Sequence, residues 1–322
     1  MDFRPRRFLE SGHVQTIYNV LFPPDNTLQG YSEDILLPTS DDSGDHLYLR
    51  HSPKEFGSPY LILLHGMEGS SESHYMVSVA KEALLRSYGV VRVNLRNCGK
   101  GFGLATRPYN AGQTEDLHSI LEYVSKNYTQ EIYVSGFSLS ANLVLKYFGE
   151  REVTLAKAFS ATSPPMDLKR TCDFIDSRAG TFYRNHFLQT LREKVASGLY
   201  SISEEMTQKV MKAKTFFDFD DFFTAPLSGY LNALNYYSSS SSFKTIQNIK
   251  LPGLVVHAKD DPVVPSDFWE EIPWKSLPHI KTILTDHGGH VGFVSDPTSE
   301  LPDGRWLPKL ILDYFDEQRK TT

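Results

Sequence analysis

One pentapeptide, Gly136-Phe137-Ser138-Leu139-Ser140, constrains the fold of this chain more than any other feature. A largely apolar run, 131–134, precedes it, and a helix-like run, 141–147, follows it. A strand, a tight turn with a central serine and then a helix form a nucleophile elbow, which lifts the serine hydroxyl above the end of a sheet. The turn is strained, so small residues must flank it. We therefore expect Ser138 to be a nucleophile.

Short apolar runs alternate with longer amphipathic runs along the 322 residues, a pattern typical of a mostly parallel sheet covered by helices. Eight strands are expected, at 35–37, 47–49, 60–64, 90–95, 132–134, 156–160, 253–257 and 280–284. Helices are expected near 73–87, 114–126, 139–148 and 306–318. The predicted fold class is α/β, with an eight-stranded, mostly parallel sheet and helices on both faces.

The alternation stops between residues 166 and 245. This region contains helix-like runs at 187–195 and 204–213, an aromatic-rich run at 216–237, and a serine run, Ser238 to Ser242. A serine run is typical of a flexible joint. We interpret 1–322 as one domain and 166–245 as a helical lid inserted over the face that carries Ser138. Many of its aromatic side chains are expected to form the core of the lid itself.

Two histidines that follow Ser138 are candidates for its base. His290 ends the run His287-Gly288-Gly289-His290, in which two glycines let a loop bring an imidazole to the elbow. Because a serine hydroxyl needs a base to become nucleophilic, His290 is expected to supply it. His287 is the competing base. The two histidines also have the spacing of a metal pair, but the sequence shows no carboxylate motif beside them to complete a zinc site.

The acid that orients the base is expected just after the late strand at 253–257, where Asp260 and Asp261 both qualify. A common pattern here is a small residue, two others, an aspartate, two others and a valine. In the run Ala258-Lys259-Asp260-Asp261-Pro262-Val263-Val264 it selects Asp261. Asp260 is then expected to hold the turn. The order Ser, Asp, His along the chain is that of α/β-hydrolases.

Two glycine-rich runs follow early strands. The first, His65-Gly66-Met67-Glu68-Gly69, is expected to supply the Met67 N–H to an oxyanion hole, and the residue after the nucleophile, Leu139, supplies the second N–H. A simple glycine turn is the alternative. The second run, 97–103, lacks the ending and spacing of a phosphate-binding loop. Cys98 within it has no catalytic cysteine motif around it and is expected to be a loop thiol.

Composition excludes several classes of protein. A net charge of −6 gives no reason to expect nucleic-acid binding, and two cysteines provide no disulfide framework, which fits a reducing compartment. Arginines at 4, 6 and 7 are not followed by the apolar core of a secretory signal. The apolar runs fall far short of the roughly 20 residues that span a bilayer. We expect a cytoplasmic protein without a transmembrane segment; peripheral membrane contact and oligomeric state stay open.

The chain resembles the AB hydrolase type-four family of α/β-hydrolases, esterases and acyltransferases related to the yeast ethyl ester synthases. The resemblance spans nearly the whole chain and is carried by Gly12-His13-Val14-Gln15-Thr16, His65-Gly66-Met67-Glu68-Gly69-Ser70, Asn94-Leu95-Arg96, Tyr109 with Gly112 and Asp116, Thr224-Ala225-Pro226-Leu227, Asp260-Asp261-Pro262 and Gly288-Gly289-His290-Val291-Gly292-Phe293. It implies Ser138 as nucleophile, Asp261 as acid and His290 as base. This sequence departs from the family pattern at the last glycine of the elbow, at a loop glycine and at a loop histidine, which are Ser140, Asn97 and Asn110 here.

Together these expectations describe a serine carboxylic-ester hydrolase that works through an acyl-Ser138 intermediate, needs no metal or organic cofactor, and takes a small-molecule ester as its partner. Some aromatic side chains of the lid are expected to pack in its own core, which leaves a limited apolar groove for the substrate. This favours short-to-medium acyl chains. One alternative is an acyltransferase that passes the acyl group to an alcohol. Another is a non-catalytic, ligand-binding relative. A serine at this elbow argues against haloalkane and epoxide chemistry, which uses an aspartate there.

Overall fold

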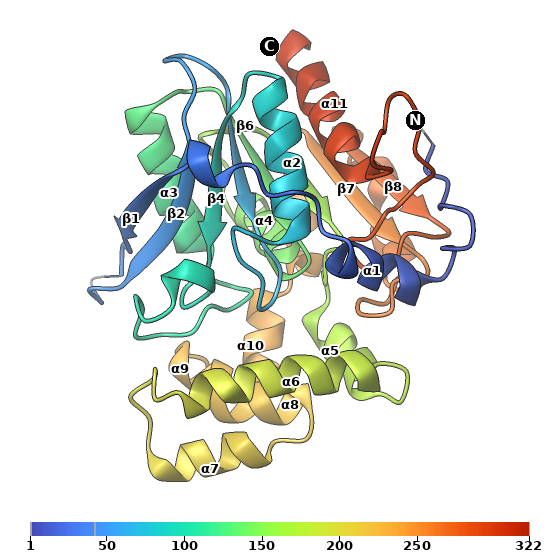
Figure 1. Ribbon diagram of the computed structural model, residues 1–322. Helices are drawn as coiled ribbons and strands as arrows, with labels where there is room; N and C mark the ends of the chain where they lie inside the picture. Colours follow the sequence, from blue (N-terminus) through green and yellow to red (C-terminus); the bar gives the residue numbers. More distant parts are fainter. Residues whose placement is uncertain (1, 42, 322) are drawn as a thin grey trace.

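Eight strands form one sheet in the computed structural model of this protein, which describes residues 2–41 and 43–321 (Figure 1). Their order is β1-β2-β4-β3-β5-β6-β7-β8. β2 pairs antiparallel with β1 and β4, and the other neighbours are parallel. The strands are Glu33–Pro38 (β1), His46–Ser52 (β2), Tyr60–Leu64 (β3), Gly89–Asn94 (β4), Ile132–Phe137 (β5), Ala156–Thr162 (β6), Gly253–Ala258 (β7) and Ile280–Thr285 (β8). All eight expected strands are present, and the predicted fold class is confirmed.

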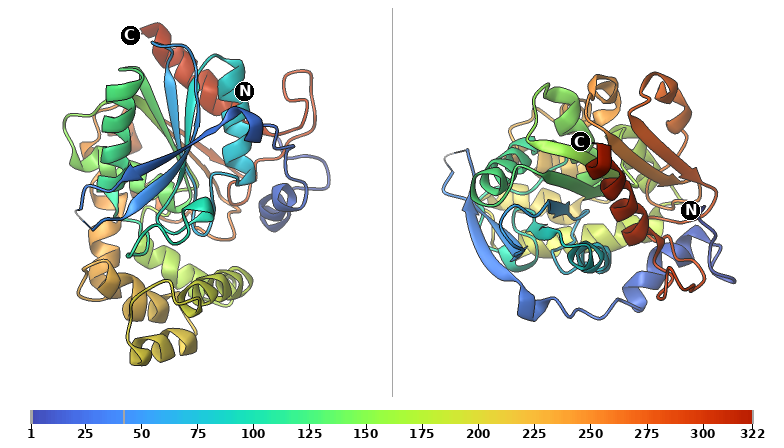
Figure 2. Two further views of the ribbon diagram at one scale, coloured as in Figure 1. Left: turned by 60° about the vertical axis from the view of Figure 1, so that its left-hand side comes forward. Right: turned by 90° about the horizontal axis from the view of Figure 1, so that it is seen from above.

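Helices cover the sheet on both faces, as Figure 2 shows. They are α2 (His74–Leu85) and α11 (Trp306–Thr321) on one face, and α3 (Thr114–Asn127) and α4 (Leu139–Glu150) on the other. In β3, Leu61 and Leu63 pack into the core beneath α2 and α11, whereas Ile62 and Leu64 pack into the core beneath α3 and α4. Burial on both faces makes a parallel strand a continuous apolar run, and such runs are visible in the sequence.

Between β6 and β7 the chain leaves the sheet and forms a separate group of helices, drawn below the sheet in Figure 1. They are α5 (Leu168–Asp176), α6 (Thr181–Ala196), α7 (Glu204–Lys212), α8 (Phe216–Phe219), a π turn (Asp220–Thr224), α9 (Ala225–Leu227) and α10 (Ala233–Ser240). The two helix-like runs expected here correspond to α6 and α7. The short helices α5 and α10 were not expected.

The serine run that was expected to be a flexible joint has a different role, and that expectation is wrong. Ser240 ends α10, and both Ser240 and Ser242 are fully buried. The side chain of Asn142 in α4 accepts a hydrogen bond from the Ser242 N–H (2.9 Å) and donates one to the Ser240 carbonyl (2.8 Å). A buried amide that bonds two backbone groups fixes the end of the inserted helices directly behind the elbow.

An unexpected helix near the N-terminus, α1 (Gly12–Leu21), packs beside the loop that follows β8. Gln15 of α1 is fully buried. Its side-chain nitrogen donates to the Val294 carbonyl (3.0 Å), and its side-chain oxygen accepts from the Val294 N–H (2.6 Å). The start of the chain is therefore held against a loop almost 280 residues away. None of the helices within the described residues is both long enough and apolar enough to cross a bilayer.

Candidate active site

The sharp turn between β5 and α4 carries Ser138 in a left-handed backbone conformation, with φ of 53°. A residue other than glycine in this region is strained, and such strain is found where the surrounding structure enforces it. Two glycines make the turn sterically possible. A Cβ atom on Gly136 would lie 2.4 Å from the Ser140 carbonyl oxygen, and one on Gly66 would lie 2.8 Å from the Ser138 Cβ. The structure thus has the geometry expected of a nucleophile elbow.

Ser140, which stands where the family pattern has glycine, is accommodated without loosening the turn. Its side chain is fully buried, and its hydroxyl donates a hydrogen bond to the His65 carbonyl at the end of β3. The extra hydroxymethyl group therefore connects the elbow to the loop that was expected to form the oxyanion hole. Asn97, another departure, adopts the left-handed φ of 58° and bonds the backbone of its loop, including the Ala105 carbonyl at 2.8 Å.

The structure brings Ser138, His290 and Asp261 together. The Ser138 Oγ lies 2.8 Å from His290 Nε2, and His290 Nδ1 lies 2.8 Å from Asp261 Oδ2. Because a carboxylate can only accept, the hydrogen of the neutral imidazole is on Nδ1, and Nε2 is left to accept from the serine hydroxyl. Burial raises the pKa of Asp261, but His290, together with His257 and the Val264 N–H, lowers it more in total, so the pKa lies below its ordinary value. Asp261 is therefore a carboxylate.

Asp260 and Asp261 bond different groups of the loop 287–290. Asp261 also accepts from the Val263 and Val264 N–H groups through Oδ1, at 2.8 and 2.9 Å, which fixes its rotamer. Asp260 accepts instead from the Gly289 N–H at 2.9 Å. His287, the competing base, faces the Glu10 carbonyl at 2.9 Å and does not reach the elbow. Asp260 thus holds the turn before His290, as expected of the aspartate that does not meet the base.

Helix α1 contacts the loop that carries His290, and the sequence did not predict this contact. The Thr16 Oγ accepts a hydrogen bond from the His290 N–H (2.8 Å), and a Cβ on Gly289 would lie 2.2 Å from the Gly12 carbonyl oxygen. α1 therefore packs directly against the backbone of the histidine loop. The run Gly12-His13-Val14-Gln15-Thr16 was a usable signal, because it was one of the motifs that carried the family resemblance, but a motif does not state which loop it contacts.

The backbone around Met67 leaves the Met67 N–H without a hydrogen bond within the described residues. On either side of it, the Gly66 N–H donates to the Tyr75 hydroxyl (3.0 Å) and the Glu68 N–H donates to the Tyr109 hydroxyl (3.1 Å). Within the described part of the chain, the Met67 and Leu139 N–H groups form none of the hydrogen bonds found. Both residues line the same cavity as Ser138. Two free donors beside a nucleophile are what an oxyanion hole requires.

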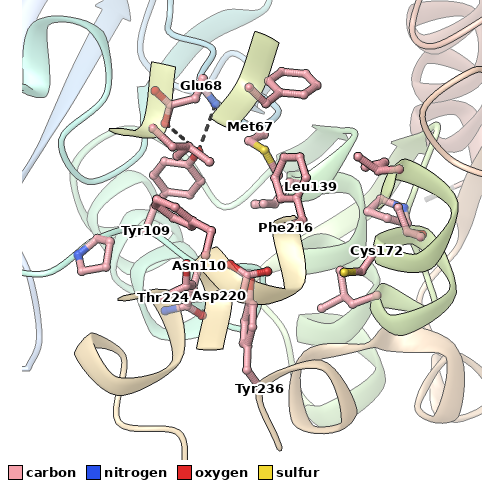
Figure 3. Close-up of a pocket in the computed structure, with 18 of the residues that line it drawn as sticks. Met67, Glu68, Tyr109, Asn110, Leu139, Cys172, Phe216, Asp220, Thr224 and Tyr236 are labelled. Carbon is pink, nitrogen blue, oxygen red and sulfur yellow. Dashed lines mark hydrogen bonds between the residues drawn. The ribbon is translucent and has the colours of Figure 1, made fainter. Parts of the chain in front are cut away.

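Ser138 lies between two spaces. An inner cavity of about 100 Å³ extends beneath the inserted helices and is largely apolar and aromatic (Figure 3). An outer cleft of about 620 Å³ contains His290 and is bordered by α1 and α6. Phe187 of α6 lines both. The residues that line the inner cavity include Met67, Tyr109, Leu139, Leu168, Ile175, Leu191, Tyr200, Phe216, Phe219, Phe223, Tyr236 and Val264.

Cys98 is a buried thiol, which disfavours a role as nucleophile. Its exposed fraction is 2%, and burial raises its pKa to about 12. A thiol at that pKa is not ionised near neutral pH and is a poor nucleophile. We expect Cys98→Ser to keep ester turnover within a few-fold of the unmodified protein, measured as kcat and KM on a nitrophenyl ester. A loss as large as that of a Ser138 variant would assign the nucleophile to Cys98.

A buried ion pair connects the inserted helices to the Met67 loop. Lys194 of α6 lies 2.8 Å from the Glu68 carboxylate, which also accepts from the Tyr109 hydroxyl at 2.8 Å. The two charged side chains are only 12% and 8% exposed. Removing one partner of such a pair leaves the other charge buried without compensation, which typically destabilises a protein by about 3–5 kcal/mol.

We expect Lys194→Met to lower the free energy of unfolding by about 3 kcal/mol. The matched control is Lys209→Met in α7, since Lys209 forms a 2.8 Å pair with Glu205 in which both side chains are more than half exposed. An exposed pair contributes about 0–1 kcal/mol. Urea unfolding of both variants measures the difference. Equal losses would show that the Glu68–Lys194 contact does not hold the inserted helices down.

Several known proteins are similar to this chain in sequence or in fold. A family model described as "alpha/beta hydrolase fold" matches residues 59–297. The "Monoacylglycerol lipase" of Saccharomyces cerevisiae is 32% identical over 271 residues, covering 80% of this chain and 59% of the yeast protein. "Putative esterase YheT" of Escherichia coli is 27% identical over 324 residues, covering 98% and 93%. The Pyrococcus furiosus esterase Pf2001 superposes with a TM-score of 0.61 at 18% identity, covering 92% and 97%.

Proposed function

Because this chain belongs to the alpha/beta hydrolase fold family and is an esterase-like hydrolase, we propose that it cleaves carboxylic esters through a covalent acyl-Ser138 intermediate. The observation that carries the proposal is the unbroken hydrogen-bond chain from Asp261 through His290 to Ser138, with both contacts at 2.8 Å. A hydroxyl held on a neutral imidazole, which is in turn held on a buried carboxylate, is the arrangement that activates a serine.

The proposed reaction begins when the Ser138 Oγ attacks the ester carbonyl carbon and His290 Nε2 takes the hydroxyl proton. The carbonyl oxygen becomes an oxyanion that accepts from the Met67 and Leu139 N–H groups. His290 then gives the proton to the departing alcohol, and the acyl group stays on Ser138. Water then enters, loses a proton to His290 and attacks the acyl carbon. The bond to Ser138 breaks, His290 returns the proton to the Ser138 Oγ, and the acid is released. Asp261 stabilises the imidazolium in both halves of the reaction and keeps its own charge.

Product analysis tests the reaction class. Hydrolysis of a nitrophenyl ester in heavy-oxygen water should place the heavy oxygen in the released acid, because water attacks the acyl carbon. Added ethanol separates the two kinds of acyl transfer: an esterase forms mainly acid, whereas an acyltransferase forms mainly ethyl ester. The outer cleft beside His290 has room for an alcohol, which keeps transfer as the second candidate. Absence of heavy oxygen from the acid would contradict the proposal.

We also propose that the inserted helices form a lid that limits the acyl chain. The inner cavity, at about 100 Å³, is smaller than the engineered cavity of about 150 Å³ that accommodates benzene. Each methylene buried there contributes about 0.8 kcal/mol until the space is filled. Short-to-medium acyl chains are therefore expected to be the preferred substrates.

On nitrophenyl esters of increasing length, kcat/KM should rise to a maximum and then fall. Phe187→Ala should move that maximum to longer chains, because Phe187 lines both the inner cavity and the outer cleft, and removal of its ring adds space at both. The control is Phe217→Ala. Phe217 is also a partly buried phenylalanine of the inserted helices, but it is not among the residues that line either space. A steady rise to the longest chains in the unmodified protein, or identical shifts in both variants, would remove the lid from chain-length selection.

A further inference from the structure

One carboxyl group points into the inner cavity among its apolar and aromatic lining. Asp220 is the first residue of the π turn, and its side chain is directed toward the middle of the lining residues in Figure 3. Asp220 Oδ2 accepts a hydrogen bond from the Tyr237 hydroxyl at 2.7 Å. A carboxylate has about four lone-pair positions, so Asp220 retains capacity to accept from a ligand. π turns inside helical segments frequently occur at functional sites.

The surroundings of Asp220 leave its charge without a matching cation. Burial raises the pKa of Asp220 to about 6, although hydrogen bonds from Thr224 and Tyr237 lower it, and the nearby Asp176 raises it further. Asp220 takes part in none of the ion pairs among the described residues. Lys194 lines the same cavity but pairs with Glu68. Binding of a plain hydrocarbon chain beside this carboxyl group is unfavourable, because the chain displaces water from the carboxyl group and offers no hydrogen bond in return.

We propose that Asp220 is a specificity residue that binds a hydroxyl group on the acyl part of the substrate. The inference rests on the proposed function, since Ser138 and Asp220 line one cavity and an acyl chain attached to Ser138 would extend along it. The substrate class is an ester of a hydroxylated, short-to-medium carboxylic acid. An ammonium group is the less suitable donor, because the Lys194 ammonium already lines this small space.

A purely structural role is the competing explanation, in which Asp220 only holds Tyr237 of α10 against the π turn. The two roles respond differently to three substitutions. Tyr237→Phe removes the structural hydrogen bond and leaves the acceptor in the cavity. Asp220→Leu removes the acceptor and keeps the branched shape of the side chain. Asp220→Asn keeps an oxygen acceptor but lacks the charge that strengthens hydrogen bonds to a carboxylate.

The experiment compares pairs of nitrophenyl esters that have the same chain length and differ only by a hydroxyl, placed at successive carbons of the acyl chain. The readout is the ratio of the two kcat/KM values. We expect the unmodified protein to favour the hydroxylated ester by about 10- to 100-fold at one position, which is the effect of a hydrogen bond to a charged group. Tyr237→Phe should keep that ratio, Asp220→Asn should lower it several-fold, and Asp220→Leu should bring it below one.

A preference for the unsubstituted ester at every position would overturn the proposal, as would a ratio that does not change in Asp220→Leu and Asp220→Asn. Faster turnover of the matched ester carrying an ammonium group would overturn the assignment to hydroxyl. Fluorophosphonate labelling of Ser138 in the same variants separates this inference from the proposed function. Labelled protein without a hydroxyl preference refutes only the Asp220 site, whereas unlabelled, folded protein refutes the acyl-serine reaction.

Discussion

Ser138→Ala is expected to lower kcat for ester hydrolysis by about 10⁶-fold, the loss found when the serine of a similar triad is removed. The physical reason is that in the proposed reaction the Oγ forms the bond to the acyl carbon, and this Oγ lies 2.8 Å from His290 Nε2. Steady-state hydrolysis of a short nitrophenyl ester by purified protein measures the effect.

Ser140→Gly is the matched control for this result. Ser140 belongs to the same turn, but its hydroxyl is directed to the His65 carbonyl and away from His290. Removing it restores the glycine of the family pattern, and we expect turnover within about tenfold of the unmodified protein, since one neutral hydrogen bond contributes about 0.5–1.5 kcal/mol. Folded Ser138→Ala protein that retains turnover would show that the chemistry occurs elsewhere.

Asp261→Asn is expected to lower kcat by about 10⁴-fold. An asparagine amide facing His290 Nδ1 favours the tautomer in which Nε2 carries the hydrogen, and that nitrogen can no longer accept the Ser138 proton. The backbone bonds from Val263 and Val264 to Asp261 can persist with the amide oxygen, so the fold is expected to survive. The measurement is kcat on the same ester, with thermal unfolding to establish that the variant is folded.

The neighbouring substitution Asp260→Asn provides the comparison. Asp260 accepts from the Gly289 N–H and contacts neither Ser138 nor the imidazole of His290 in the described structure. Burial raises the pKa of Asp260 above its ordinary value, so its ionised form is not favoured by this environment. We expect a small decrease in Tm and a kcat loss below about tenfold. A larger loss for Asp260→Asn than for Asp261→Asn would reverse the assignment of the acid.

Much of the fold could be predicted from the sequence because the central strands β3, β4, β5 and β7 are buried on both faces. Runs such as Tyr60–Leu64 are apolar throughout, and no surface-facing residue interrupts the pattern. The three residues Ser138, Asp261 and His290 could be selected for a similar reason. Each lies immediately after a strand or in a glycine-rich loop, so local sequence indicates the place of each side chain at the same edge of the sheet.

Other features depend on contacts between distant segments and leave little trace in the local pattern. α1 is held by Gln15 and Thr16, which bond a loop near the other end of the chain. The serine run forms a helix end and not a flexible joint because Asn142 hydrogen-bonds its backbone. In a flexible joint, water would form those hydrogen bonds. Asp220 is one of several acidic residues between 218 and 221, and only the π turn directs it into the cavity.

Mapping the covalent adduct tests the acyl-serine proposal most directly. The protein is reacted with a fluorophosphonate, digested, and sequenced by tandem mass spectrometry, with the Ser138→Ala variant treated in parallel. We predict one modified residue, Ser138, in the unmodified protein, loss of ester hydrolysis in proportion to its modification, and no adduct in the variant. An adduct on Ser140, on Cys98 or at another position, accompanied by the same loss of activity, would contradict the account, and so would full activity after Ser138 has been completely modified.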